Sequence, residues 1–135
     1  PLSAELRKVH QYLTFSTATP FQLAIADYML HHPEYTGELP GFYQEKRDLF
    51  CQVIEHSRFS FTPAKGTYFQ LVDYSAISDM DDVSFSRWLT TEKGVAAIPV
   101  SVFCHNPDPE MRLVRFCFAK NEKTLREAGE LLCQL

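Results

Sequence analysis

Apolar residues recur at helical spacing near both ends of the chain, and they alternate with polar residues in several short stretches between. A helical repeat of apolar positions predicts an amphipathic helix, whereas alternation predicts a strand with one buried face. The pattern predicts helices at residues 3–15, 20–30, 40–56, 82–93 and 121–135. It predicts strands at residues 58–62, 67–73, 95–98 and 113–118. The order is therefore three helices followed by β-β-α-β-β-α.

Residues with capping chemistry stand at the expected helix ends. Thr19, Pro20 and Gln22 predict a helix start with a capping box, because threonine caps well and proline suits the first helical position. Residues 34–40 are expected to form a loop. The further N-cap candidates are Ser3, Asp81 or Asp82, and Asn121, and Gly94 is expected just past a helix end.

A block of helices followed by a mixed sheet with helices on one face is an α+β arrangement. Residues 40–135 are expected to form one compact unit, with the helices at 82–93 and 121–135 on one face of the sheet. The helices within residues 3–30 are too few to enclose a core. Their apolar faces are therefore expected to stay exposed within a monomer and to drive self-association.

Composition narrows the classes of function. The chain has 135 residues, 45% of them hydrophobic, and a formal net charge of −4, which argues against a nucleic-acid partner. No apolar stretch reaches the length of a membrane span, and the first residues do not look like a signal peptide, so a cytoplasmic location without membrane association is expected. The four cysteines form no close pair and are expected to be reduced.

Few residues point to chemistry by pattern alone. The five histidines and four cysteines form no metal-binding motif, and Cys104 beside His105 is not a catalytic triad. Alternation at residues 113–118 places Arg115 inside an apolar strand. A buried guanidinium needs an acceptor. Arg115 is therefore interpreted as an internal salt bridge, an edge-strand arginine or a carboxylate-binding residue. Residues 94–103, a short apolar strand that ends at Pro99 and a small-residue loop, are interpreted either as a plain strand end or as a segment that lines a pocket.

Four segments in order resemble the C-terminal part of class I/II (fold type I) aminotransferases, and most closely the branch of methionine aminotransferase and kynurenine–oxoglutarate transaminase (glutamine transaminase K). The resemblance covers the whole chain. Its segments are residues 9–20, residues 66–75, residues 94–103 and residues 114–118.

The resemblance implies a pyridoxal 5′-phosphate-dependent enzyme that transfers an amino group between an amino acid (methionine, aromatic or kynurenine-like) and a 2-oxo acid. It implies that Arg115 binds the substrate α-carboxylate and that Phe15 reaches the active site of the partner subunit in a homodimer. Residues 1–33 would be the end of the large, cofactor-binding domain, and residues 34–135 the small C-terminal domain.

The resemblance also implies that the Schiff-base lysine lies in a Ser-x-x-Lys stretch upstream of these segments. None of the six lysines here has that context, so this chain has no catalytic residue of its own and is expected to bind no cofactor and to be inactive alone. It is interpreted as a truncated piece or a remnant reading frame. The alternatives are a ferredoxin-like regulatory module that binds a small molecule without catalysis, and an interaction fragment that pairs with a separate large-domain chain.

Overall fold

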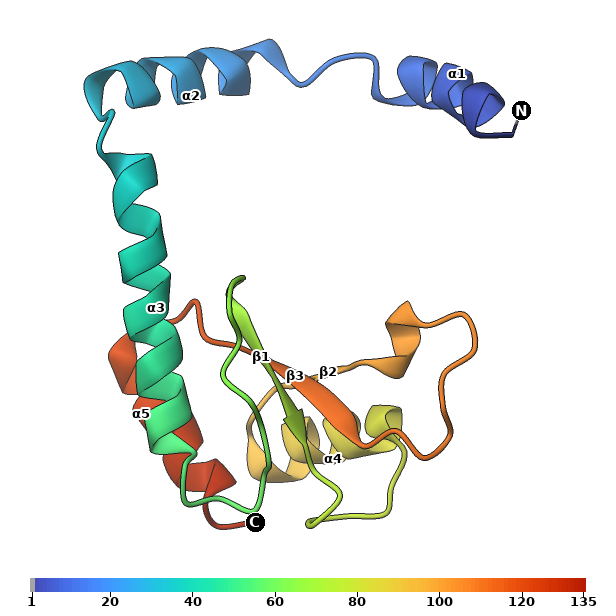
Figure 1. The fold of residues 1–135 in the computed structure, drawn as a ribbon, viewed down its shortest axis with the longest axis vertical. Coiled ribbons are helices and arrows are strands. Elements are labelled where there is room, and N and C mark those ends of the chain that lie inside the picture. The colour runs from blue at the N-terminus through green and yellow to red at the C-terminus, as the bar shows by residue number, and fades with distance from the viewer. Residues whose placement is uncertain (1) are drawn as a thin grey trace. The chain divides into compact units, whose positions relative to one another are not determined.

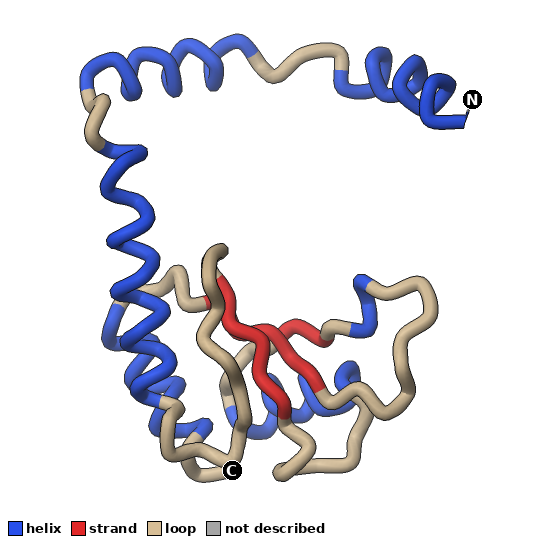
Figure 2. Tube along the Cα trace, in the orientation of Figure 1, coloured by secondary structure: helices blue, strands red, loops and turns tan. Residues whose placement is uncertain are grey.

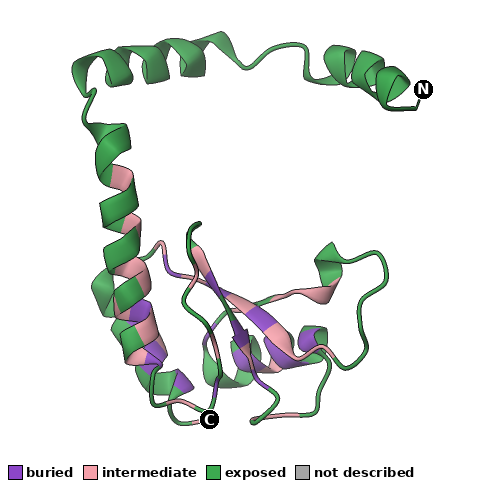
Figure 3. Cartoon of the chain, viewed as in Figure 1, coloured by how far each residue is buried: buried purple, intermediate pink, exposed green. Residues whose placement is uncertain are grey.

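The computed structural model describes residues 2–135 and divides into two compact units, Pro1–Leu39 and Pro40–Leu135 (Figure 1). The first unit is called the N-terminal unit below, and the second the C-terminal unit. The N-terminal unit contains α1 (Leu2–Thr14) and α2 (Thr19–His31), close to the predicted ranges. No residue of either helix is buried (Figure 3), as the sequence predicted.

The predicted caps of these two helices are wrong. Helix α1 begins at Leu2, so Ser3 lies inside it. The N-cap of α2 is Ala18, which makes no side-chain hydrogen bond, and Thr19 is already helical. The amide of Gln22 instead donates to the carbonyl of Thr17. The chain ahead of α2 is thus held by one side-chain hydrogen bond in place of a reciprocal capping box.

Helix α3 (Tyr35–Val53) begins earlier than predicted and includes most of the expected loop at residues 34–40. Pro40 lies inside the helix near its start. A proline there removes one backbone hydrogen bond, and the remaining turns of a long helix tolerate that loss. The presence of Pro40 therefore did not mark the helix boundary.

The C-terminal unit is built on a three-stranded sheet in the order β1-β3-β2. The strands are β1 (Phe69–Asp73), β2 (Ile98–Pro99) and β3 (Leu113–Cys117). Both pairings are antiparallel, so the sheet is antiparallel throughout its described strands and the expected mixed pairing is wrong. The α+β class itself is confirmed.

The strand predicted at residues 58–62 does not form, and the segment is loop in Figure 2. It pairs with β1 only through a bridge between Ser60 and Asp73. Beyond that bridge, the buried side chain of Gln70 makes the hydrogen bonds to this segment. Its amide donates to the carbonyl of Thr62 at 2.9 Å and accepts from the N–H of Ala64 at 2.9 Å. A side chain thus satisfies backbone groups that a strand ladder would otherwise pair.

One face of the sheet is buried against helices, as predicted. Val72, Val114 and Phe116 belong to the buried core, together with residues of α3, α4 (Asp82–Lys93) and α5 (Glu122–Leu132). Figure 1 shows these three helices around the sheet. The helical members of this core are Phe50, Phe85, Leu89, Leu125 and Leu132. The opposite face carries the alternate residues of β1 and β3, which are only partly covered.

The caps of α4 and α5 agree with the sequence. Asp81 accepts a hydrogen bond from the N–H of Ser84 at 2.9 Å, and Asn121 accepts one from Thr124 at 2.8 Å. Gly94 follows α4 with a left-handed φ of 74°, which glycine adopts without the penalty that a Cβ brings. None of the helices described for residues 2–135 is both long and apolar enough to cross a bilayer.

Helix α5 packs closely on α3 at Gly129, where substitution is expected to destabilise the C-terminal unit. A Cβ at Gly129 would lie 2.6 Å from Cγ2 of Val53 and 3.2 Å from the Val53 carbonyl oxygen. Overpacking of this kind costs about 1–3 kcal/mol, so Gly129→Ala should lower the urea midpoint of unfolding. Gly41→Ala is the control, because a Cβ there meets nothing within 4 Å. Equal midpoints for the two variants would contradict the close packing.

Candidate functional site

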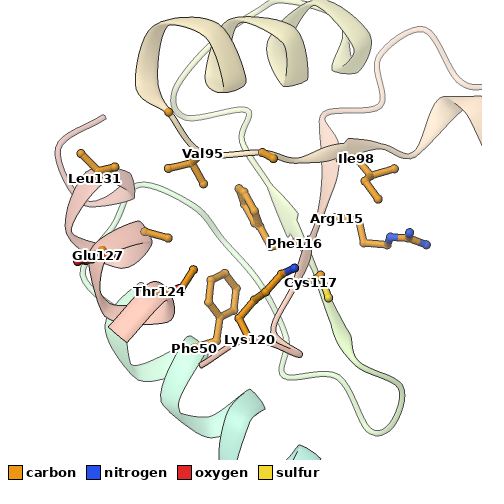
Figure 4. A pocket seen from close by; sticks show the side chains of 13 residues that line it. Phe50, Val95, Ile98, Arg115, Phe116, Cys117, Lys120, Thr124, Glu127 and Leu131 are labelled. Atoms are coloured by element: carbon orange, nitrogen blue, oxygen red, sulfur yellow. The ribbon is translucent and has the colours of Figure 1, made fainter. Parts of the chain in front are cut away.

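Arg115 lies in the middle of the sheet. It belongs to the central strand β3, where it pairs with Leu71 of β1 on one side and with Ile98 of β2 on the other. Arg115 and Phe116 extend to different sides of β3 (Figure 4), so the arginine is on the partly covered face while the phenylalanine enters the core. Hydrogen bonding on both sides of β3 therefore fixes the backbone that carries Arg115.

Two aromatic rings flank the guanidinium of Arg115. Its Cζ lies 4.5 Å from the ring centroid of Phe69 and 5.2 Å from that of Phe103. Among residues 2–135, no carboxylate oxygen lies within 4.0 Å of its nitrogens, and no hydrogen bond to the side chain is found. Ring faces attract the cation without using its N–H groups. The internal salt bridge and the edge-strand position considered for Arg115 are therefore both wrong.

Phe103 reaches this site from a short turn after β2. The turn is η1 (Ser101–Phe103), a 3-10 helix closed by hydrogen bonds from Phe103 to Val100 at 3.1 Å and from Cys104 to Ser101 at 2.9 Å. Both Val102 and Phe103 remain exposed. The end of the segment at residues 94–103 thus places the ring of Phe103 beside Arg115.

A cavity of about 430 Å³ lies on the other side of β3, beside α5 (Figure 4). Phe50, Val95 and Phe116 contribute apolar walls, whereas Lys120 and Glu127 supply charge. Arg115 contributes to the wall, but its guanidinium extends away from the cavity in Figure 4. The segment at residues 94–103 that the sequence offered as a possible pocket wall supplies Gly94, Val95, Ala96 and Ile98, whereas no motif in the sequence joined it to the lining residues of α3 and α5. Its lining is completed by Gly94, Ala96, Ile98, Cys117, Thr124, Ala128 and Leu131.

Phe15, the second candidate residue, belongs to the N-terminal unit. It directly follows α1 with a left-handed φ of 49°, and its N–H donates to the carbonyl of Gln11 at 3.2 Å. Its ring is 87% exposed. A left-handed conformation is uncommon for a residue with a Cβ. The described residues thus leave the ring free to contact another part of an assembly, and its role stays a prediction.

Arg112, which directly precedes β3, does not face solvent. Its side chain is only 17% exposed. The guanidinium donates to the carbonyl of Pro109 at 2.8 Å and lies 3.8 Å from a carboxylate oxygen of Glu110. Arg112 therefore closes the preceding loop, and its N–H groups are partly used, unlike those of Arg115.

The described residues do not fit a pyridoxal-phosphate site. Five of the six lysines are exposed, and the half-buried Lys46 lies over the ring of Phe42. Lys8 and Lys123 pair with carboxylates on their own helices, and Lys93 lies over Trp88. An amine that forms a Schiff base usually lies buried in an active site or beside another cation, whereas five of these six lysines are exposed. No group of three metal-ligating side chains was found in residues 2–135 either.

The chain matches known proteins along its whole length. The family model described as aminotransferase class I and II matches residues 2–132. The methionine aminotransferase of Escherichia coli K12 is 58% identical over 135 residues, which is 100% of this chain and 35% of that protein. Human kynurenine–oxoglutarate transaminase 3 is 33% identical, over 97% of this chain and 33% of that protein.

Solved structures agree. The crystal structure of the Escherichia coli protein YbdL, reported with a methionine aminotransferase function, superposes with a TM-score of 0.84 and 58% identity over 100% of this chain and 35% of that one. N-succinyldiaminopimelate aminotransferase from Mycobacterium tuberculosis gives 0.82 at 33% identity, over 98% of this chain and 35% of that one. This chain thus spans about a third of these relatives and corresponds to their C-terminal part. It belongs to the class I and II aminotransferase family.

Proposed function

We propose that this chain is the substrate-carboxylate-binding part of a pyridoxal-phosphate-dependent aminotransferase, in which Arg115 binds the α-carboxylate. The observation that carries the proposal is the guanidinium of Arg115 on the central strand, which lies over the rings of Phe69 and Phe103 and has no carboxylate partner among residues 2–135. A planar guanidinium matches a carboxylate through two parallel hydrogen bonds. Every amino acid and 2-oxo acid carries that carboxylate, so one arginine serves both half-reactions.

The proposed substrates are a methionine-like, aromatic or kynurenine-like amino acid and a 2-oxo acid acceptor. The names of the relatives support this range, since they include a methionine aminotransferase at 58% identity and kynurenine–oxoglutarate transaminases at 33% and 35%. Pyridoxal 5′-phosphate supplies the electron sink for the amino-group transfer in such enzymes. The residues of this chain contribute substrate binding in the proposal and not cofactor binding.

The proposal includes a cytoplasmic homodimer in which Phe15 reaches the partner's active site. The exposure of Phe15 and of the apolar faces of α1 and α2 supports it, because large bare apolar surfaces are usually covered in an assembly. The proposal also takes residues 1–33 as the end of the large domain and residues 34–135 as the small domain, as the resemblance implies. The regulatory-module alternative is not proposed, because the aminotransferase match extends over residues 2–132.

Borohydride trapping tests the proposal. With pyridoxal phosphate, the isolated 135-residue chain is expected to form no stoichiometric Schiff base, because its lysines are exposed or engaged on the surface. The whole protein should transaminate methionine and should be labelled on one lysine outside this chain. Mass spectrometry of the labelled peptides gives the measurement. Stoichiometric labelling of one of the six lysines here would overturn the assignment of the cofactor site, and absence of transamination by the whole protein would overturn the proposed function.

A further inference from the structure

A buried carboxylate without a cationic partner lies at the start of α4. Asp82 is 4% exposed, and no ion pair to it is found among residues 2–135. It does not cap its helix, because the neighbouring Asp81 already accepts from the N–H of Ser84. Burying a carboxylate is costly unless strong hydrogen bonds meet it. The two hydrogen bonds that Asp82 accepts are therefore expected to offset the cost of burying its charge.

Both contacts go to one residue that is distant in the sequence. One carboxylate oxygen accepts from the backbone N–H of Ser101 at 2.6 Å, and the other accepts from the Ser101 hydroxyl at 2.7 Å. The position of Asp82 at the N-terminal end of α4 also favours its negative charge. Charge-assisted hydrogen bonds are short and strong, so a two-point contact fixes both the place and the orientation of Ser101.

Ser101 is the first residue of η1, and Phe103 is the last. The 3-10 hydrogen bonds of this turn leave little freedom between the two residues. Phe103 in turn lies with its ring centroid 5.2 Å from Cζ of Arg115. A continuous path of contacts therefore leads from the buried carboxylate of Asp82 to the guanidinium, although no hydrogen bond or ion pair among residues 2–135 joins Asp82 directly to Arg115.

We propose that Asp82 is a positioning residue for substrate binding, which acts through Ser101 to hold Phe103 against Arg115. The inference rests on the proposed function of Arg115 as the carboxylate-binding residue. Without the anchor, η1 would be free to move, and the ring that orients the guanidinium plane would be lost. The substrate carboxylate would then meet an arginine whose two N–H groups are no longer held in one direction.

The test uses the whole holoenzyme with methionine and a 2-oxo acid. Asp82→Ala is expected to raise KM for both substrates by about 10–100-fold, with a smaller change in kcat. Ser101→Ala keeps the backbone contact and should raise KM about fivefold. Asp82→Asn should recover most of the loss, because its amide can still accept from the N–H and donate to the hydroxyl of Ser101. Asp81→Ser is the matched control, since serine keeps the cap and touches neither group.

A double-mutant comparison with Arg115→Ala separates positioning from general stability. When Arg115 is already alanine, adding Asp82→Ala should raise KM no further, because the group that it orients is gone. If the increases in KM from Asp82→Ala and Arg115→Ala multiply in the double variant, the inference is overturned. It is also overturned if the KM of Asp82→Ala equals that of the Asp81→Ser control. If Asp82→Ala does not fold, Ser101→Ala decides, and an unchanged KM there overturns the inference. If Arg115→Ala itself leaves KM unchanged, the proposed function fails and this inference fails with it.

Discussion

Replacing Arg115 with alanine in the whole enzyme is expected to lower kcat/KM by about 10²–10³-fold in both half-reactions. The guanidinium is unpaired among the described residues, so alanine removes a group that is free to bind substrate and breaks no internal ion pair. The loss should therefore appear in substrate affinity and not in stability. Stopped-flow measurement of each half-reaction, together with thermal unfolding, separates the two.

The comparison variants make this prediction specific. Arg115→Lys keeps the charge but not the two-point planar match, so it should also be impaired. Arg126→Ala is the inert control, because this arginine is exposed and its closest carboxylate, on Glu122, is 4.0 Å away. Arg112→Ala should lower stability through its loop contacts more than it lowers kcat/KM. If Arg112→Ala damages kcat/KM more than Arg115→Ala does, Arg115 is not the carboxylate-binding residue.

Replacing Phe85 with alanine is expected to destabilise the C-terminal unit by about 3–5 kcal/mol. Phe85 is fully buried and stacks on Tyr74, with ring centroids 3.9 Å apart and an interplanar angle of 1°. It also contacts Phe59 and Trp88 through neighbouring rings. Alanine would remove all three ring contacts and leave a cavity that this packed core cannot easily refill. Urea unfolding measures the free-energy change.

A second readout reports on the same packing. Burial raises the pKa of Tyr74 to about 12, and the nearby charge of Asp82 adds to the shift. If Phe85→Ala opens the core, the pKa of Tyr74 should fall toward its ordinary value of 10. Phe42→Ala is the control, because Phe42 is 50% exposed and should lose far less stability. Equal losses at the two positions would contradict this account of the core.

Strand alternation and helix-capping residues, which are local features of the sequence, correctly predicted the face that carries Arg115 and the starts of two helices. Alternation placed Arg115 on the face opposite Phe116, and the caps at Asp81 and Asn121 fixed the starts of two helices. These features depend on residues within a few positions of one another, which a sequence pattern can represent. The family resemblance added the proposed role of Arg115, which the pattern left open among three interpretations.

Contacts between distant residues could not be predicted in this way. The strand at residues 58–62 has the right alternation, but the Gln70 side chain occupies the groups that would have paired. Likewise, nothing in the sequence joins Asp82 to Ser101, which lies 19 residues away, and either aspartate was an equally good cap. Such contacts are decided by tertiary packing, which overrides local preference.

The buried amide of Gln70 has a consequence for how the C-terminal unit behaves at high concentration. Strand β1 is at the edge of the sheet, where unpaired N–H and C=O groups would be a template for a strand of another molecule. The bridge at Ser60 and the Gln70 hydrogen bonds to Thr62 and Ala64 place the protein's own chain along that edge. The same side chain that prevents a fourth strand therefore also protects the unit from edge-to-edge aggregation.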